Sequence, residues 1–298
     1  MPEGDTLYRL AARLRPALVG KPVIELLLPR TELGTVDRLV GRTVASVEAK
    51  GKNLLIGFDD GSVLHTHLRM LGSWRLAREP AAPVRGMSWV VAVLRVPGAT
   101  AVCFRAPVVR LLRPGAAAVD PRLGALGPDL LDVAVDLEEA QRRLRGRAAQ
   151  PIGVAIMDQQ VVAGIGNVYK SEILFIQRLD PFAPVSAYSD EELRALLVLA
   201  VELMTRNVDE RPDRSATEPG AIPRVGKGMR TTRAAGLGGV GPVHVYGRSG
   251  RSCFTCGTTI RMARQGPQRR STYYCPSCQP DRRRPPPRGD LPAAPTPL

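Results

Sequence analysis

A glycine turn leads directly into a predicted helix within residues 158–175, which read DQQVVAGIGNVYKSEILF. The turn is Gly164-Ile165-Gly166, and Asn167 can cap a helix that we expect to run through Ile176. The glycines resemble the start of a dinucleotide-binding fingerprint, but Tyr169 stands where that fingerprint needs its third glycine, and no strong strand of a βαβ unit precedes the turn. We therefore interpret the segment as a helix amino terminus suited to binding phosphate.

Helix signals continue on both sides of this segment. Capping boxes at Asp136 and Ser189 each precede an apolar series at helical spacing. Pro151 suits the first turn of a helix that we expect to run to about Gln159. These signals predict a helical domain over residues 136–242, whose Gly-, Arg- and Pro-rich end is expected to form a loop.

The beginning of the chain predicts one helix followed by many short strands. Leucines at helical spacing predict a helix over residues 5–18. Short runs rich in Val, Leu and Ile then alternate with turn signals, which indicates a β-sandwich or barrel. We expect strands at residues 23–28, 44–48, 53–58, 62–67, 88–96 and 101–112, with hairpin turns at 59–61 and 97–98.

These patterns predict an α+β protein with more than one domain. Its parts are a β-sandwich with an amino-terminal helix, a helical domain and a carboxy-terminal zinc finger. The expected boundaries are 1–115 for the sandwich, 116–135 for a linker, 136–242 for the helical domain, 243–280 for the zinc finger and 281–298 for an Arg- and Pro-rich disordered tail.

The charge balance is the first indication of a partner. Lys and Arg number 42 against 28 Asp and Glu, which gives a net charge of +14 and a pI near 10.3. A protein this basic attracts polyanions, of which nucleic acid is the commonest and an anionic membrane surface the alternative. We find no apolar run long enough to span a bilayer and no signal peptide, so we expect a cytoplasmic protein with no membrane partner. The plainer interpretation is an arginine-rich protein without a polyanion partner.

Four of the five cysteines form two C-x-x-C pairs. Cys253 and Cys256 are separated by 18 residues from Cys275 and Cys278, a spacing that places four thiolates on two knuckles and suits tetrahedral Zn²⁺. No ligand position is left open, so the predicted zinc is structural. A redox dithiol is the alternative. The hairpin between the pairs is more basic than a merely structural loop needs, since it carries Arg261, Arg264, Arg269 and Arg270.

The amino terminus is a candidate nucleophile. Removal of the initiator Met would leave Pro2 as a free secondary amine whose pKa lies far below that of a lysine. Such an amine can attack a sugar C1′ and form an iminium. Glu3 beside it could protonate the sugar ring oxygen or assist the leaving base. Each residue alone has an ordinary alternative, because many chains begin Met-Pro and the helix dipole favours an acid near a helix start.

Two lysines and two histidines are further candidates in the strand region. Lys50 and Lys52 flank Gly51 in a chain with five lysines and 37 arginines, so the two lysines in one turn suggest a phosphate contact or an acid. A solvated loop is the commoner alternative for such a pair. His65 and His67 alternate on a predicted strand, so both face the same side. A third metal ligand is missing nearby, which favours DNA-facing or buried imidazoles over a metal site.

Together these segments resemble the formamidopyrimidine-DNA glycosylase/endonuclease VIII family, and its endonuclease VIII branch in particular. The resemblance extends from Met1 to about Gln279 and rests on four motifs in order. They are the opening MPEGDT, the paired segments KGKNLLI and LHTHLRMLG at residues 50–56 and 64–72, the glycine-turn helix quoted above, and the two cysteine pairs. The third motif resembles the family's helix–two-turn–helix motif, so the resemblance implies a helix–two-turn–helix domain over residues 136–242. It also implies a bacterial protein associated with the nucleoid.

The resemblance implies a role for each matched residue. Pro2 would be the nucleophile and Schiff-base amine, and Glu3 the acid at the sugar. Lys52 matches the family's catalytic lysine, with Lys50 as the less favoured neighbour. Arg270 matches the zinc-finger arginine that grips phosphate, and Arg269 is its alternative because the hairpin is slightly longer than the family pattern. DNA contacts would come from His67, Asn167, Lys170 and the void-filling loop Arg69, Met70 and Leu71.

The implied function is that of a bifunctional DNA glycosylase/AP lyase. It would remove oxidised pyrimidines from double-stranded DNA, or act at abasic sites, and cleave the strand by β,δ-elimination. Gly4-Asp5-Thr6 after Glu3 favours the pyrimidine branch. The alternatives are formamidopyrimidine/8-oxoguanine specificity and a non-catalytic zinc-finger DNA-binding protein, although a pure binding protein needs no free secondary amine. We expect a monomer, because one copy must embrace the DNA.

Overall fold

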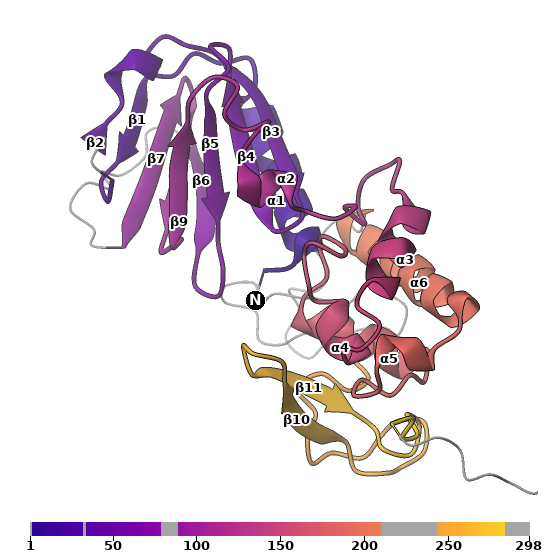
Figure 1. Cartoon of the computed structure of the whole chain (residues 1–298). Coiled ribbons are helices and arrows are strands. Elements are labelled where there is room, and N and C mark those ends of the chain that lie inside the picture. Colours follow the sequence, from indigo (N-terminus) through magenta and orange to yellow (C-terminus); the bar gives the residue numbers. More distant parts are fainter. Residues whose placement is uncertain (1, 32–33, 79–88, 210–242, 284–298) are drawn as a thin grey trace, which may run out of the picture.

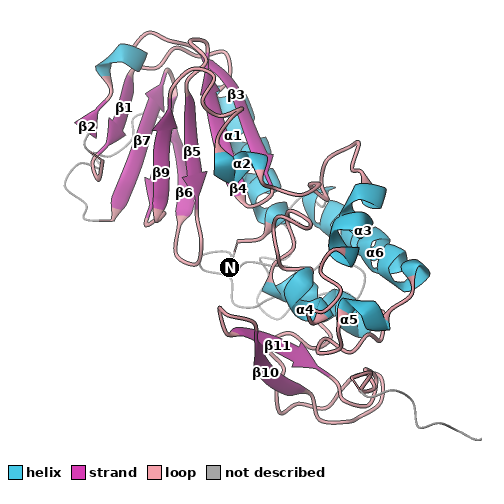
Figure 2. Cartoon of the chain, in the orientation of Figure 1, coloured by secondary structure: helices cyan, strands magenta, loops and turns pink. Residues whose placement is uncertain are grey.

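The computed structural model describes residues 2–31, 34–78, 89–209 and 243–283 (Figure 1). The strands of two antiparallel sheets gather in one lobe, helices α3 to α6 form a second, and a two-stranded hairpin lies below the helices (Figure 2). This arrangement matches the predicted α+β organisation. The greater part of the predicted loop at residues 209–242 and of the predicted tail at 281–298 lies outside the described residues.

Helix α1 (Gly4–Leu18) begins the strand lobe and packs against β3. Its buried residues repeat at helical spacing, since Leu7, Leu14 and Leu18 are all fully enclosed in the core. This stripe is the reason that the helix was predicted within one residue of its observed start.

The two sheets of this lobe have the strand orders β2-β1-β7-β8-β6 and β3-β4-β5-β9, with every neighbouring pair antiparallel. Their inner faces and α1 share one hydrophobic core. The strands are β1 (Glu25–Leu28), β2 (Gly34–Thr35), β3 (Val44–Lys50), β4 (Asn53–Phe58), β5 (Val63–His67), β6 (Ser73–Arg78), β7 (Val90–Val96), β8 (Ala99–Phe104) and β9 (Val108–Leu112); the turn η1 (Asp37–Leu39) lies between β2 and β3.

One strand prediction was wrong. Residues 101–112 form two strands rather than one, and β8 and β9 belong to different sheets. Arg105 between them has a left-handed backbone with φ 51°, and Pro107 has no N–H for a ladder, so the chain turns from one sheet to the other there. Strands β2 and β6 were not predicted, because β2 has two residues and β6 interleaves arginines with apolar residues.

The helical lobe has its own core of buried Leu, Ile and Val side chains. Its helices are α3 (Leu137–Arg145), α4 (Ile152–Ala155), α5 (Asn167–Ile176) and α6 (Asp190–Asp209), with the turn η2 (Val185–Ala187) before α6. The expected linker contains a short helix, α2 (Pro121–Gly124), which the Asp120 side chain caps by accepting from the N–H groups of Arg122 and Leu123.

Helix α4 is shorter than predicted, because it ends at Ala155 instead of near Gln159. The Asp158 side chain accepts a hydrogen bond from the Gln160 N–H at 2.9 Å, a local turn that competes with continuation of the helix. The chain then reaches the glycine turn through irregular backbone.

The zinc-finger segment packs under α5 as the hairpin β10 (Arg261–Gln265) and β11 (Arg270–Tyr274). A small apolar cluster that includes Phe175, Val245 and Ile260 joins this segment to α5. Among the described residues, no helix has the length and apolar character needed to cross a membrane.

The reciprocal capping box at α6 provides a test of the helical lobe. The Ser189 N–H donates to Glu192 Oε2 at 2.9 Å, and the Glu192 N–H donates to Ser189 Oγ at 3.2 Å. We expect Ser189→Ala to lower the free energy of unfolding by about 1 kcal/mol, because one helix donor loses its acceptor. Calorimetry checks this, with the exposed Ser186→Ala as the control. Equal stability of the two variants would show that the box contributes nothing.

Candidate active site at the junction of the lobes

The Glu3 carboxylate caps helix α5. It accepts from the backbone N–H groups of Gly166 at 2.9 Å, Val168 at 2.8 Å and Tyr169 at 3.4 Å, and it is fully buried. The first N–H groups of a helix lack partners within the helix and carry a partial positive charge, so a carboxylate there is stabilised. A side chain 163 residues away along the chain therefore closes the helix that contains the quoted motif.

Asn167 does not cap α5, which corrects the sequence prediction. The N-cap is Gly166, and Asn167 is the first residue of the helix. A side chain at position 166 would overlap the Glu3 carboxyl group, so glycine is the residue that lets this carboxylate approach the backbone. Asn167 instead donates from Nδ2 to Ser271 Oγ of β11 at 2.9 Å.

Pro2 directly precedes two residues that the helical lobe holds in place. Glu3 follows it, and the Gly4 N–H donates to the Gly164 carbonyl at 3.0 Å. The backbones of these two glycines are so close that a Cβ on Gly4 would lie 2.8 Å from the Gly164 Cα. Pro2 itself is half-buried, and the amino-terminal end of the described chain lies between the strand lobe and the helices (Figure 1). The candidate nucleophile is thus placed where the two lobes meet.

Lys52 reaches the same junction from the strand lobe. It occupies the turn between β3 and β4, and its Nζ donates to the Ile165 carbonyl at 2.5 Å. The pKa of Lys52 is lowered to about 8, mainly by burial and also by the charge of Arg270, while the charge of Glu3 opposes the shift. Lys50 is exposed at the other side of the turn. Of the two sequence candidates, Lys52 is the one that lies beside Glu3.

Glu3 and Lys52 form an oppositely charged buried pair. Burial raises the pKa of the Glu3 carboxyl, while the Lys52 charge and the N–H groups of Val168 and Tyr169 work against that rise. A carboxyl in such surroundings can hold a proton nearer neutral pH than an exposed glutamate can, which suits an acid that must donate one.

Arg270 approaches this pair from the zinc-finger hairpin. Its guanidinium donates to Gln268 Oε1 at 3.0 and 2.9 Å, and its charge lowers the pKa of both Lys52 and Lys170. Arg269 is exposed in the hairpin turn with φ 49°. Arg270 is thus the hairpin arginine whose charge reaches Lys52. This favours Arg270 over Arg269 as the arginine that binds phosphate at the site.

Lys170 does not present its ammonium to the surface. The residue is 1% exposed, and Nζ donates to the Ser271 carbonyl at 3.1 Å and to Thr272 Oγ1 at 2.8 Å. Burial lowers its pKa to about 7. The ammonium thus joins α5 to the hairpin in this structure, and the expected direct contact of Lys170 with DNA stays a prediction.

The loop between β5 and β6 projects away from the core. Met70 is 64% exposed and Leu71 is 72% exposed, and Arg69 before them has a left-handed φ of 47°. The Arg69 N–H donates to His67 Nδ1 at 3.2 Å, and burial lowers the pKa of that imidazole. Two exposed apolar side chains at a loop tip are suited to entering an apolar space on a partner.

Two acidic residues that sequence reasoning missed also hold the junction together. Asp129 accepts from the Gly51 N–H at 2.6 Å and from the Tyr8 hydroxyl at 3.1 Å, which ties the predicted linker to the lysine turn and to α1. Buried Glu172 accepts from three consecutive N–H groups, those of residues 244–246, and so fastens the zinc-finger segment to α5. A charged residue within the apolar end of the quoted motif was the available signal for Glu172.

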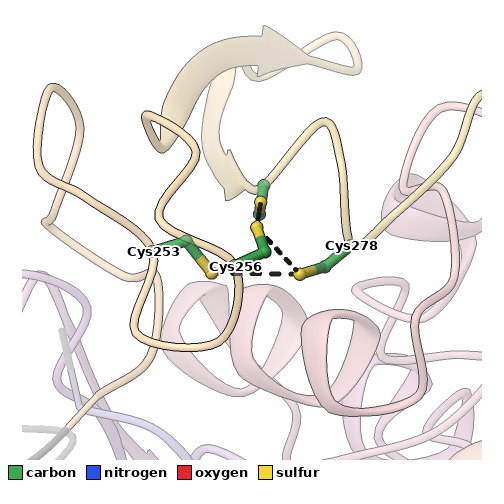
Figure 3. A group of neighbouring side chains, drawn as sticks. Cys253, Cys256 and Cys278 are labelled. Atoms are coloured by element: carbon green, nitrogen blue, oxygen red, sulfur yellow. Dashed lines mark hydrogen bonds between the residues drawn. The ribbon is translucent and has the colours of Figure 1, made fainter.

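The four paired cysteines converge at the end of the hairpin. Their Sγ atoms all lie within 4.8 Å of one another, with Cys253 to Cys278 at 3.9 Å and Cys256 to Cys275 at 3.5 Å. The labelled side chains in Figure 3 point toward a common centre. Four sulfur ligands with this convergence fit a tetrahedral structural zinc site. His65 and His67 are not part of any metal-ligand cluster within the described residues.

Comparison with known proteins agrees with this architecture. Residues 1–107 match the model of the formamidopyrimidine-DNA glycosylase N-terminal domain, and residues 126–217 match that of the formamidopyrimidine-DNA glycosylase H2TH domain. The probable endonuclease 8 2 of Streptomyces coelicolor is 38% identical, with 94% of each chain covered. The DNA-(apurinic or apyrimidinic site) lyase Nei2 of Mycolicibacterium smegmatis is 34% identical, with 94% of this chain and 99% of that protein covered.

Solved structures share the fold. The MutM (Fpg) protein of Thermus thermophilus is 28% identical with a TM-score of 0.70, covering 93% of this chain and 98% of that one. The Lactococcus lactis Fpg in complex with DNA containing an abasic site has a TM-score of 0.74 at 21% identity, covering 94% of this chain and 100% of that one. The predicted fold class is confirmed.

The contact between Glu3 and Gly166 generates a direct test. In Gly166→Ala the new methyl group must displace the Glu3 carboxyl from the α5 amino terminus. We expect a loss of about 1–3 kcal/mol in the free energy of unfolding, the usual cost of overpacking a close contact. Thermal unfolding measures it, with Gly124→Ala as the control, since a Cβ there meets no atom within 4 Å. An equal midpoint for both variants would contradict the cap.

Proposed function

Because this chain belongs to the formamidopyrimidine-DNA glycosylase/endonuclease VIII family, whose members are DNA glycosylases and AP lyases of base excision repair, we propose that it removes oxidised pyrimidines through a Schiff base on Pro2 and cleaves the strand by β,δ-elimination. The observation that carries the proposal is the meeting of Pro2, Glu3 and Lys52 at the α5 amino terminus. Two segments distant in sequence supply an amine, an acid and a cation to the start of a helix in a third.

The reaction follows from the chemistry of these groups. The neutral secondary amine of Pro2 attacks the sugar C1′ as the bond to the damaged base breaks, and the base leaves with the proton that the amine loses. Glu3 then donates a proton to the ring oxygen O4′, so that the C1′–O4′ bond opens and an iminium forms between Pro2 and C1′. The resulting iminium acidifies the C2′ proton. Loss of that proton expels the 3′ phosphate, and a second elimination expels the 5′ phosphate. Water then hydrolyses the iminium and returns Pro2 as a free amine.

The remaining matched residues would hold the DNA. A glycosylase reaches C1′ only when the nucleotide leaves the stack, and an apolar wedge fills the space left behind. We assign the wedge to Met70 and Leu71, whose exposure and apolar character support it. Lys52, Asn167 and Arg270 surround the α5 amino terminus and would bind phosphates there without reading sequence. His67 and Arg69 would contact the backbone beside the wedge.

We assign a single structural Zn²⁺ to Cys253, Cys256, Cys275 and Cys278. Four thiolates leave no position for substrate, so the ion would fix the hairpin and take no part in the reaction. Its contribution is the placement of Arg270 next to Lys52.

Pyrimidine lesions are the first candidate, because Gly4-Asp5-Thr6 after Glu3 resembles the endonuclease VIII branch. The Streptomyces and Mycolicibacterium proteins at 38% and 34% identity exceed the Thermus thermophilus formamidopyrimidine-DNA glycosylase at 32%. Formamidopyrimidine or 8-oxoguanine specificity is the second candidate. A non-catalytic DNA-binding protein is disfavoured, because it would not need a buried acid beside a terminal amine. We also propose that the enzyme acts as a monomer.

Trapping of the covalent intermediate tests the proposal. We expect untagged protein, mixed with a duplex that contains one thymine glycol and with borohydride, to form a covalent protein–DNA adduct because hydride reduces the iminium. Pro2→Gly should lose most of this adduct, and a parallel 8-oxoguanine duplex identifies the preferred lesion. Undiminished trapping in Pro2→Gly would remove Pro2 as the nucleophile. Binding without an adduct on either duplex would support a non-catalytic protein.

Metal removal tests the zinc assignment. We expect one zinc per chain in the purified protein and its loss in Cys278→Ser, because tetrahedral coordination needs all four thiolates. Affinity for an abasic-site duplex should then fall about tenfold or more, since each lost charge-assisted hydrogen bond costs about 1.5–3 kcal/mol. Elemental analysis and DNA titration measure both quantities, with Cys103→Ala as the control for loss of a thiol outside the cluster. Zinc retention in Cys278→Ser would contradict the assigned ligand set.

A further inference from the structure

We propose that His65 and Asn53 are positioning residues that hold the turn from which Lys52 enters the active site. Their side chains form a buried hydrogen-bonded pair behind the turn. Among the described residues, neither side chain has a hydrogen bond to Glu3 or to the α5 amino terminus. The inference rests on the proposed role of Lys52 and extends it to residues that the resemblance does not assign.

The turn that carries Lys52 is short and closed at both ends. Lys50 pairs with Asn53 across the β3–β4 ladder, so Gly51 and Lys52 are the two central residues. Gly51 has φ 56°, and its N–H donates to Asp129 Oδ2 at 2.6 Å. Asn53 Nδ2 donates to the Lys50 carbonyl at 3.0 Å, which closes the other side of the turn. The Asn53 amide thus fixes the backbone on which Lys52 stands.

His65 fixes the Asn53 amide in turn. Its Nε2 lies 2.9 Å from Asn53 Oδ1, and both side chains are buried. Asn53 Nδ2 is already used as a donor to Lys50, so Oδ1 accepts and Nε2 carries the proton. The pKa of His65 is lowered to about 4, mainly by burial and also by the charge of Arg110 on the neighbouring strand, so the ring is neutral at physiological pH.

The other ring nitrogen shows that this histidine is not an ordinary core residue. His65 Nδ1 is buried without a hydrogen-bond partner among the described residues. An unpaired buried polar atom is unfavourable, and a leucine of similar volume would fill the space without that cost. In the part of the chain that the structure describes, the one side-chain hydrogen bond of His65 is the bond to Asn53, so its effect is on the turn.

Loosening the turn would change the surroundings of Lys52. Its ammonium now faces the Ile165 carbonyl and Glu3, with Arg270 and His67 as the other titratable groups around it and the Pro2 amine next to Glu3. A turn without the Asn53 contact would let Nζ move toward water. The ammonium would then regain hydration and its pKa would rise toward that of an exposed lysine.

Three variants separate positioning from general stability. His65→Leu keeps the volume and removes the donor, whereas His65→Gln keeps an N–H that can reach Asn53 Oδ1. Thr66→Val is the matched control on the same strand, because Thr66 is equally buried and accepts a hydrogen bond from Trp74 Nε1 at 3.1 Å without touching the turn. Lys52→Gln reports separately on the proposed role of the lysine.

The first measurement is the pKa of Lys52, determined by NMR in the absence of substrate. The chain has five lysines, so protein labelled with ¹³C at lysine Cε gives few signals, and Lys52→Gln identifies the one from Lys52. We expect a pKa of about 8 for Lys52 in the unaltered protein. In His65→Leu it should rise by about one pH unit or more, and His65→Gln should restore most of the original value. Thr66→Val should leave it unchanged even where thermal stability falls as much as in His65→Leu.

The second measurement is the single-turnover cleavage rate of an abasic-site duplex between pH 6 and 10. We expect His65→Leu to lower the rate about tenfold near neutral pH with little change in DNA affinity, and to move the alkaline fall in rate to higher pH. His65→Gln should recover the rate. An unchanged Lys52 pKa and pH profile in His65→Leu, or an equal change in Thr66→Val, would overturn the inference. Full activity of Lys52→Gln would instead contradict the proposed function of Lys52, whatever the titration of His65→Leu shows.

Discussion

The buried Glu3 carboxylate at the amino terminus of α5 is the contact on which the arrangement of the site depends. It satisfies three N–H groups of a helix in one lobe from a residue that begins the first helix of the other. A carboxylate removed from water is costly unless donors surround it, so the two lobes must stay docked for Glu3 to remain where it is. Pro2 directly precedes Glu3 and is therefore also held at the junction of the two lobes.

The other components of the site are attached to the same helix. Lys52 bonds to the carbonyl of Ile165 just before α5, and Lys170 and Asn167 on α5 bond to the hairpin that carries Arg270. Glu172 binds the segment that leads into the zinc finger. One helix of ten residues thus brings together the amino terminus, a β-turn and a zinc-stabilised hairpin. This explains how a site built from three separated segments can be held in a defined geometry.

The features that could be predicted from the sequence are those that residues close together in the chain determine. The leucine stripe of α1, the capping box at Ser189 and the paired cysteines each carry their own signal, and each was found as predicted in the structure. The features that the sequence did not predict depend on contacts between residues far apart in the chain. Nothing near Asn167 shows that Glu3 will cap its helix, and the burial of Lys170 depends on a hairpin about a hundred residues later. The break between β8 and β9 was missed because the residues on both sides are equally strand-like.

The central claim is that Pro2 attacks the sugar while Glu3 stays on α5. A crystal structure of the borohydride-reduced complex with a lesion duplex tests both parts at once. The account predicts a covalent bond between the Pro2 nitrogen and C1′, with the Glu3 carboxylate still accepting from the Gly166 and Val168 N–H groups. A bond from C1′ to the Nζ of Lys52, or a Glu3 carboxylate withdrawn from the helix, would contradict it.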